Sequence, residues 1–193
     1  KLNHNNQSFT LIELLVVIAI LAVLMSVVVI AINPAEMLKK TRDTKRVSDF
    51  DNLRTALNLY QSEIASFPFS VCDGSKIYVS LPSNNSNCSD LNLSSLPSGY
   101  TYQCSTIDNY RKINGTGWIP LNLASISVGS PLSTLPIDPK NTNADSLYYT
   151  FYCNQDEYIL TTYVEAQSNG PKGGLNALTI QDGGPDPYLY ELG

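Results

Sequence analysis

The chain has 193 residues, a formal net charge of −5, and charged residues that make up only 15% of the total. This balance argues against nucleic-acid binding as the main activity, because wrapping DNA or RNA needs a basic surface. The twelve tyrosines and five phenylalanines argue against a disordered chain.

The first feature in chain order is a polar segment, Lys1–Ser8, with no periodic apolar pattern, which predicts an irregular extension. An apolar run follows from Phe9 to Ile32, in which Glu13 is the only charge. The part from Leu14 to Ile32, ~19 residues long, would span about 29 Å as a helix, close to the ~30 Å hydrocarbon core of a bilayer. The run therefore predicts a membrane-spanning helix. A buried core helix of a soluble protein would rarely run this long without a polar face.

The residues Ser-Phe-Thr-Leu-Ile-Glu-Leu-Leu-Val-Val at positions 8–17, together with the apolar run, give the chain its most specific motif. This motif resembles the N-terminal signature of bacterial type IV pilins and type II secretion pseudopilins. The resemblance implies that Phe9 is the processed and methylated residue and that Glu13 helps subunits to dock. Ser8 stands where the family usually has glycine. If Lys1–Ser8 stay on the mature subunit, the candidate partners for Glu13 on an adjacent stalk are an amide N–H, the Thr10 hydroxyl and the Lys1 amine.

An amphipathic helix is predicted after Pro34, since proline fits the first turn of a helix. Apolar residues then recur every three or four positions and should pack against a sheet: Val47, Phe50, Leu53, Leu57, Tyr60 and Ile64. Phe67-Pro68 should follow the end of this helix. Basic residues at positions 39, 40, 42, 45 and 46 surround Asp43, and they form either a solvated helix face or a contact with neighbouring subunits.

Four cysteines, Cys72, Cys88, Cys104 and Cys153, all follow the predicted helices. An even number favours two disulfides and an oxidising location outside the cytoplasm. The favoured pairing is Cys72 with Cys88 and Cys104 with Cys153, because the first bridge would close a compact Asn/Ser-rich loop, although the sequence leaves all three pairings open. A zinc site is the competing interpretation, but no C-x-x-C pair is present.

The rest of the chain predicts a turn-rich loop at 69–99 and then strands at 100–104, 110–113, 147–153, 158–164, 177–180 and 188–192. The strands at 147–153 and 158–164 form the clearest hairpin. The expected fold is α+β, a long apolar helical stalk packed on a small antiparallel head, as in type IV pilins. The stalk and amphipathic helix would occupy residues 1–66 and the head residues 67–193.

The sequence lacks the motifs of the common enzyme classes, and we expect no enzymatic activity and no cofactor. The one weak ion site is the acidic turn with Asp182 and Asp186, which could offer oxygen ligands to Ca²⁺, although a plain turn is the simpler interpretation.

The resemblance implies a major pilin that polymerises with itself into a helical extracellular filament for adhesion, motility or DNA uptake. Before assembly the subunit would lie in the inner membrane, where it would meet the pilus assembly machinery; the surface or host ligand of the filament is not specified by any motif. The alternative is the major pseudopilin of a type II secretion system. The segments Gly117–Leu121 and Leu135–Pro139 resemble the pieces that precede the β-hairpin in the pseudopilin-like branch of the family.

Overall fold

The computed structural model describes residues 9–64, 72–154, 157–170, 177–182, 184, 186 and 188–193. By packing, the chain divides into two compact units, Lys1–Leu38 and Lys39–Gly193. This boundary lies inside the second helix, whereas the predicted division at residue 66 followed the end of that helix. The predicted extension Lys1–Ser8 lies outside the described residues.

The first unit is built from α1, Leu11–Ile32, and the first turn of α2, which spans Pro34–Ile64. Asn33 separates the two helices and has the left-handed backbone angles φ 45° and ψ 75°. The break occurs here because Pro34 has no N–H to donate to the preceding turn and its ring crowds that turn. The Asn33 carbonyl accepts from the N–H groups of Glu36 and Met37, so it starts the new helix.

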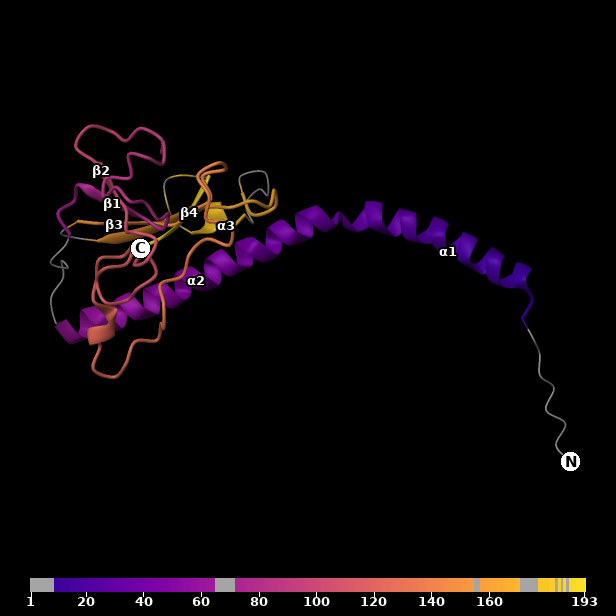
Figure 1. Cartoon of the computed structure of the whole chain (residues 1–193), viewed down its shortest axis with the longest axis horizontal. Helices are drawn as coiled ribbons and strands as arrows, with labels where there is room; N and C mark the ends of the chain where they lie inside the picture. The colour runs from indigo at the N-terminus through magenta and orange to yellow at the C-terminus, as the bar shows by residue number, and fades with distance from the viewer. Residues whose placement is uncertain are drawn as a thin grey trace, which may run out of the picture. The chain divides into compact units, whose positions relative to one another are not determined.

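The second unit contains the remainder of α2 and a five-stranded sheet in the order β2-β1-β3-β4-β5 (Figure 1). The strands are β1 Lys76–Val79, β2 Thr101–Gln103, β3 Thr150–Cys153, β4 Tyr158–Tyr163 and β5 Leu189–Leu192. Two short helices, η1 Leu123–Ser125 and α3 Leu178–Gln181, lie in the connections. The predicted α+β class is confirmed, and so is the hairpin, in which β3 and β4 pair antiparallel with Phe151 opposite Leu160.

Four predictions about the sheet and its strands are wrong. The sheet is mixed rather than antiparallel, because β1 and β2 pair in parallel. Strand β1 was missed because its four residues lie inside the turn-rich stretch that predicted only a loop. The predicted strand at 110–113 is a turn, closed by hydrogen bonds such as Tyr110 N to Thr106 O, 2.8 Å. The predicted strand at 177–180 is the single helical turn of α3, because an apolar run this short fits either structure.

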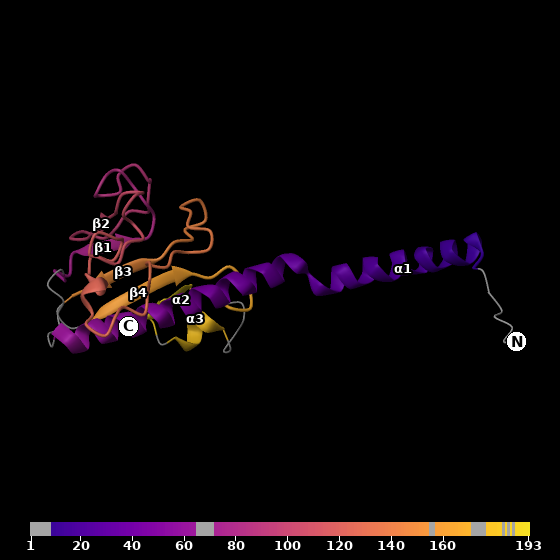
Figure 2. The ribbon, with the colours of Figure 1, turned by 60° about the horizontal axis from the view of Figure 1, so that its bottom comes forward.

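The main core lies between α2 and one face of the sheet (Figure 2). Phe50, Leu53 and Leu57 of α2 are fully buried, and the Phe50 ring packs edge-on against Tyr149 at 5.0 Å between centroids. The predicted apolar stripe is therefore confirmed for its described side chains. Trp118 completes this core, and its indole N–H donates to the Pro136 carbonyl at 2.9 Å.

Candidate functional site

The N-terminus of α1 is closed by two residues of the resemblance motif, Thr10 and Glu13. The Thr10 backbone N–H and its hydroxyl each donate to Glu13 Oε2 at 2.8 Å, and the Glu13 N–H donates to Thr10 Oγ1 at 3.3 Å. This reciprocal pattern is a capping box, which satisfies backbone donors that the first helical turn leaves without partners. The carboxylate that the sequence singled out is thus held by Thr10 of the same chain.

Apart from Glu13 and Ser26, the described side chains of α1 are apolar, so the helix has no polar face to turn toward water. Those described from Leu11 to Val28 are all exposed, and Phe9 just before the helix is 89% exposed. The stretch Leu11–Val28 is long and apolar enough to cross a membrane. An isolated helix of this kind needs lipid or other apolar helices around it.

Comparison with known families agrees with this geometry. Residues 3–29 match the model of the prokaryotic N-terminal methylation motif. The chain fits a type IV pilin-like or pseudopilin-like protein. No curated protein and no solved structure matches it. The motif and the apolar helix fit a pilin-like, membrane-anchored subunit that polymerises.

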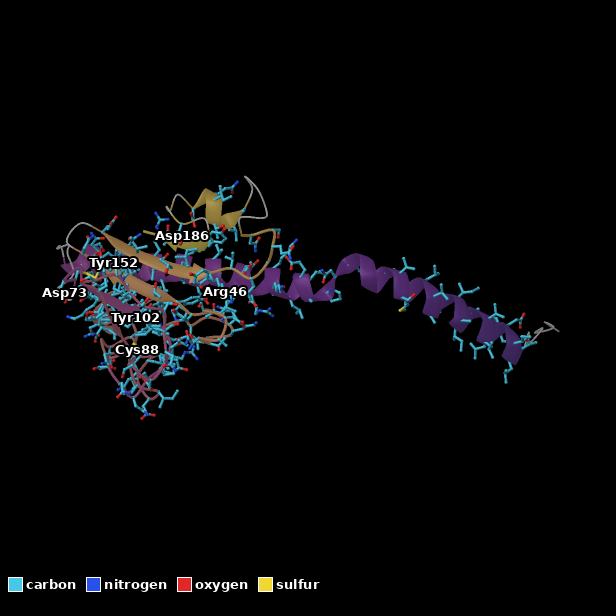
Figure 3. The ribbon with its side chains drawn as sticks, turned by 90° about the horizontal axis from the view of Figure 1, so that it is seen from above. Arg46, Asp73, Cys88, Tyr102, Tyr152 and Asp186 are labelled. Carbon is cyan, nitrogen blue, oxygen red and sulfur yellow. A yellow bond between two sulfur atoms is a disulfide. The ribbon has the colours of Figure 1, made fainter. Side chains whose placement is uncertain are left out.

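The second unit contains a buried ionic cluster centred on Arg46 of α2 (Figure 3). The Arg46 guanidinium donates to both oxygens of Asp138, at 2.6 and 3.0 Å, and to Asp43 Oδ1 at 2.7 Å. It also contacts Glu165 at 3.0 Å. The side chains of Arg46, Asp43 and Asp138 are completely buried. Neither prediction for the basic residues of α2 describes this arrangement, because Arg46 faces the interior.

Asp43 and Asp138 each accept further hydrogen bonds besides those from Arg46. Asp43 accepts from the backbone N–H groups of Glu165 and Ala166 and from the Asn169 amide, all at 2.8 Å. Asp138 Oδ1 accepts from the Lys140 N–H at 2.8 Å. These bonds join α2 to two loops that lie about a hundred residues later in the chain.

Glu165 links the cluster to the surface. Arg42 donates to both of its oxygens, at 2.6 and 2.9 Å, and Lys140 approaches at 3.1 Å. Burial of Glu165 opposes its ionisation, but the hydrogen bonds from Arg42, Lys140 and Arg46 outweigh burial and lower its pKa to about 2. Glu165 is therefore ionised at neutral pH.

A second polar contact lies one turn further along α2. The Tyr149 hydroxyl donates to Asp49 Oδ2 at 3.0 Å, and Lys45 pairs with the other oxygen at 2.5 Å. Burial and the negative charge of Asp49 raise the pKa of Tyr149, which stays protonated. In the sequence, these contacts could be recognised only from the spacing of oppositely charged residues along the helix: Asp43 and Arg46 are three positions apart, and Lys45 and Asp49 four. Ion pairs with these spacings usually lie on the helix surface, so the spacing does not indicate burial.

The four cysteines form two disulfides, and the pairing favoured from the sequence is wrong. Cys72 bonds to Cys153 and Cys88 bonds to Cys104. The parallel pairing of β1 with β2 accounts for the difference, because it brings the residue after β2, Cys104, to the loop that holds Cys88. Cys72, just before β1, then lies near the end of the neighbouring strand β3, where Cys153 is located.

The acidic turn of the weak ion site is held by backbone donors. Asp182 accepts from the Glu191 N–H at 2.8 Å and the Gly184 N–H at 3.0 Å, and Asp186 accepts from the Tyr188 N–H at 2.8 Å. Among the described residues, no three His, Cys, Asp or Glu side chains are arranged to hold a metal ion. Calcium binding at this turn stays a prediction.

Proposed function

We propose that this chain is the major subunit of a type IV pilus. The subunit would wait in the inner membrane, and the pilus assembly machinery would move it into a helical homopolymer outside the cell. The filament would serve adhesion, surface motility or DNA uptake. The observation that carries the proposal is α1, an apolar helix whose side chains from Leu11 to Val28 are all exposed and which lies largely within the methylation motif matched at residues 3–29.

Assembly would replace lipid around α1 with the α1 helices of neighbouring subunits. Both described donors of Thr10 reach Glu13 Oε2, so Oε1 is available to a donor from an adjacent helix. A carboxylate in a membrane-spanning helix costs ~2.5 kcal/mol or more at the bilayer centre and less near the helix end, where Glu13 lies, and a hydrogen-bond partner lowers that cost. Glu13 would in this way favour the packed polymer over the isolated helix in lipid.

Electron microscopy of the native assembly tests the proposal. We expect surface filaments that contain this chain and extend many times the width of the periplasm. Purified protein that forms no helical filament would instead indicate a membrane-anchored monomeric binding module, and the proposal would be wrong.

The second candidate is the major pseudopilin of a type II secretion system. It is favoured by the segment Leu135–Pro139, which resembles pseudopilin sequences and supplies Asp138 to the buried cluster. A pseudopilin would form short periplasmic assemblies, and deleting it would block secretion of exported enzymes. Long surface filaments together with normal secretion would exclude this candidate.

A further inference from the structure

The face of the sheet turned away from α2 carries a second, smaller core beneath the loop between β1 and β2. This core contains Val79, Leu81, Cys88 and Tyr148. Side chains alternate along the strands, so Phe151 and Leu160 point into the main core while Thr150 and Thr161 lie on the outer face, joined by a hydroxyl hydrogen bond of 2.6 Å. The outer face is therefore covered on one part only.

A cavity of about 220 Å³ lies where this cover ends. Its walls are three tyrosines, Tyr102, Tyr148 and Tyr163, five serine or threonine residues and three aliphatic residues. The residues come from all five strands of the sheet or from the loops beside them. The cavity thus combines ring faces with many hydroxyl groups.

A second cavity of about 420 Å³ adjoins the first, because the two share Tyr102, Ser94 and Leu96. It adds the amides of Asn87 and Asn92 and the ring of Tyr100. Figure 3 labels Tyr102 between Tyr152 and Cys88 on this side of the head. We call these two adjoining cavities together the tyrosine groove.

The walls of the tyrosine groove are fixed before any ligand arrives. The Cys88–Cys104 disulfide closes the loop, and the Asn143 amide donates to the carbonyls of Leu91 at 2.6 Å and Asn92 at 3.2 Å. Burial raises the pKa of Tyr148 to about 12 and also raises the pKa of Tyr102, so both hydroxyls keep their protons at neutral pH. A fixed wall lowers the entropy lost on binding.

The lack of charged residues in the groove limits which ligands it can bind. Among the residues that the structure describes, none that lines either cavity is charged. A charged ligand would lose its hydration without gaining a counter-charge, and a purely apolar ligand would leave the amides and hydroxyls without partners. A neutral carbohydrate avoids both costs, because its C–H faces can pack on tyrosine rings while its hydroxyls bond to amides and hydroxyls.

We propose that the tyrosine groove of the head binds a neutral oligosaccharide. Drug-sized ligands occupy cavities of ~300–1,000 Å³, so the smaller cavity suits one sugar ring and the groove as a whole a short chain of rings. The proposal goes beyond polymerisation and applies to a pilus and a pseudopilus alike, because it involves residues of the head only.

The test uses the full chain in lauryldimethylamine oxide micelles, a detergent without a sugar headgroup. The labelled protein is applied to an array of neutral and sialylated oligosaccharides, and each binder is measured again by saturation-transfer NMR. We expect binding to at least one neutral sugar and no preference for sialylated forms. An array without any neutral binder, or one with only acidic binders, would overturn the proposal.

Three variants locate the site. Tyr100→Ala and Tyr163→Ala each remove one ring from one cavity, and both rings are 40% exposed, so the fold should tolerate the changes. Each should weaken binding by about tenfold, the effect of one lost ring contact. Tyr188→Ala is the matched control, since Tyr188 is 64% exposed and lies outside both cavities. Equal weakening by all three variants would show that the sugar binds elsewhere.

Measuring sugar binding on assembled filaments shows whether the groove is open to a sugar or is occupied by a neighbouring subunit. Binding that persists in filaments supports the proposal. Binding that is present in free subunits and absent in filaments would assign the groove to a neighbouring subunit and would overturn it. Trp118 fluorescence during urea unfolding verifies that each variant is folded.

Discussion

Removing Arg46 should destabilise the head strongly, because this one side chain neutralises carboxylates that have no access to water. The cluster contains three cations, Arg42, Arg46 and Lys140, and three carboxylates, Asp43, Asp138 and Glu165. In the variant Arg46→Met the side chain still fills space, but Asp43 and Asp138 lose their contact with a cation. Breaking a buried pair in this way typically costs ~3–5 kcal/mol.

The control is Arg54→Met, the same substitution on the same helix at an exposed position. We expect a change of less than about 1 kcal/mol there, as for most surface substitutions. The assay is urea unfolding of the full chain in micelles, followed by the fluorescence of Trp118. This residue is the only tryptophan and is buried in the main core, so the signal reports on the head.

Acid should reduce the difference between wild type and Arg46→Met. The pKa of Glu165 falls from its ordinary value of 4.5 to about 2 on folding, so its contribution is complete above pH 4.5 and is lost as the pH falls toward 2. The hydrogen bonds from Arg42, Lys140 and Arg46 share this contribution. Equal unfolding free energies for Arg46→Met and Arg54→Met at pH 7 would refute this account of the cluster.

Three further predictions concern other parts of the chain. Glu13→Ala should leave the subunit in the membrane but lower the yield of filaments. Glu13→Gln keeps an oxygen acceptor for Thr10, so comparing the two variants distinguishes the effect of the helix cap from the effect of the charge. A normal filament yield from Glu13→Ala would contradict the role of Glu13. Reducing agent should destabilise the head by ~2–4 kcal/mol per disulfide, and mass spectrometry of unreduced peptides should show Cys72 linked to Cys153 and Cys88 to Cys104. Glu191→Gln should raise the melting temperature at pH 7, because burial and the nearby Asp182 and Asp186 raise the pKa of Glu191 and make its charged form unfavourable in the fold. The gain should vanish below the unfolded pKa of about 4.5, and added calcium should raise the wild-type melting temperature if the acidic turn binds the ion.

The sequence predicted the parts of the fold that depend on long patterns. The apolar run rests on unbroken hydrophobicity over many residues, whereas the helix that begins at Pro34 and the β3–β4 hairpin rest on a sustained periodicity. The sequence missed β1, because four residues inside a loop-like stretch give too short a pattern. It therefore also missed the parallel pairing with β2 and the disulfide connectivity that follows from this pairing.

The buried cluster was missed for a different reason. Arg46 and Asp43 have the spacing of an ordinary surface ion pair, and nothing near them in the sequence indicates burial. Their burial depends on Asp138 and on the chain around Glu165, which approach α2 only in the folded head. Contacts between residues about a hundred positions apart leave no periodic signal, so only the structure reveals them.

The cluster also limits where α1 and α2 can change shape during assembly. Arg42, Asp43 and Arg46 fix α2 to loops of the head, and this fixed part begins just after the boundary at Leu38. The segment Val27–Ile32 precedes this fixed part, is rich in β-branched residues and ends at the break at Asn33 and Pro34. Keeping the helix continuous through Pro34 would cost about 3 kcal/mol. In the free subunit the helix is interrupted at Asn33, and α1 is helical through Ile32. In a filament we predict that the non-helical stretch widens within about Val23 to Asn33, where neighbouring helices can shelter the freed backbone groups, while α2 stays helical from Arg42 onward. A filament map in which α1 stays helical through Ile32, with or without the break at Asn33, would refute this prediction and would mean that packing between subunits overrides the local sequence.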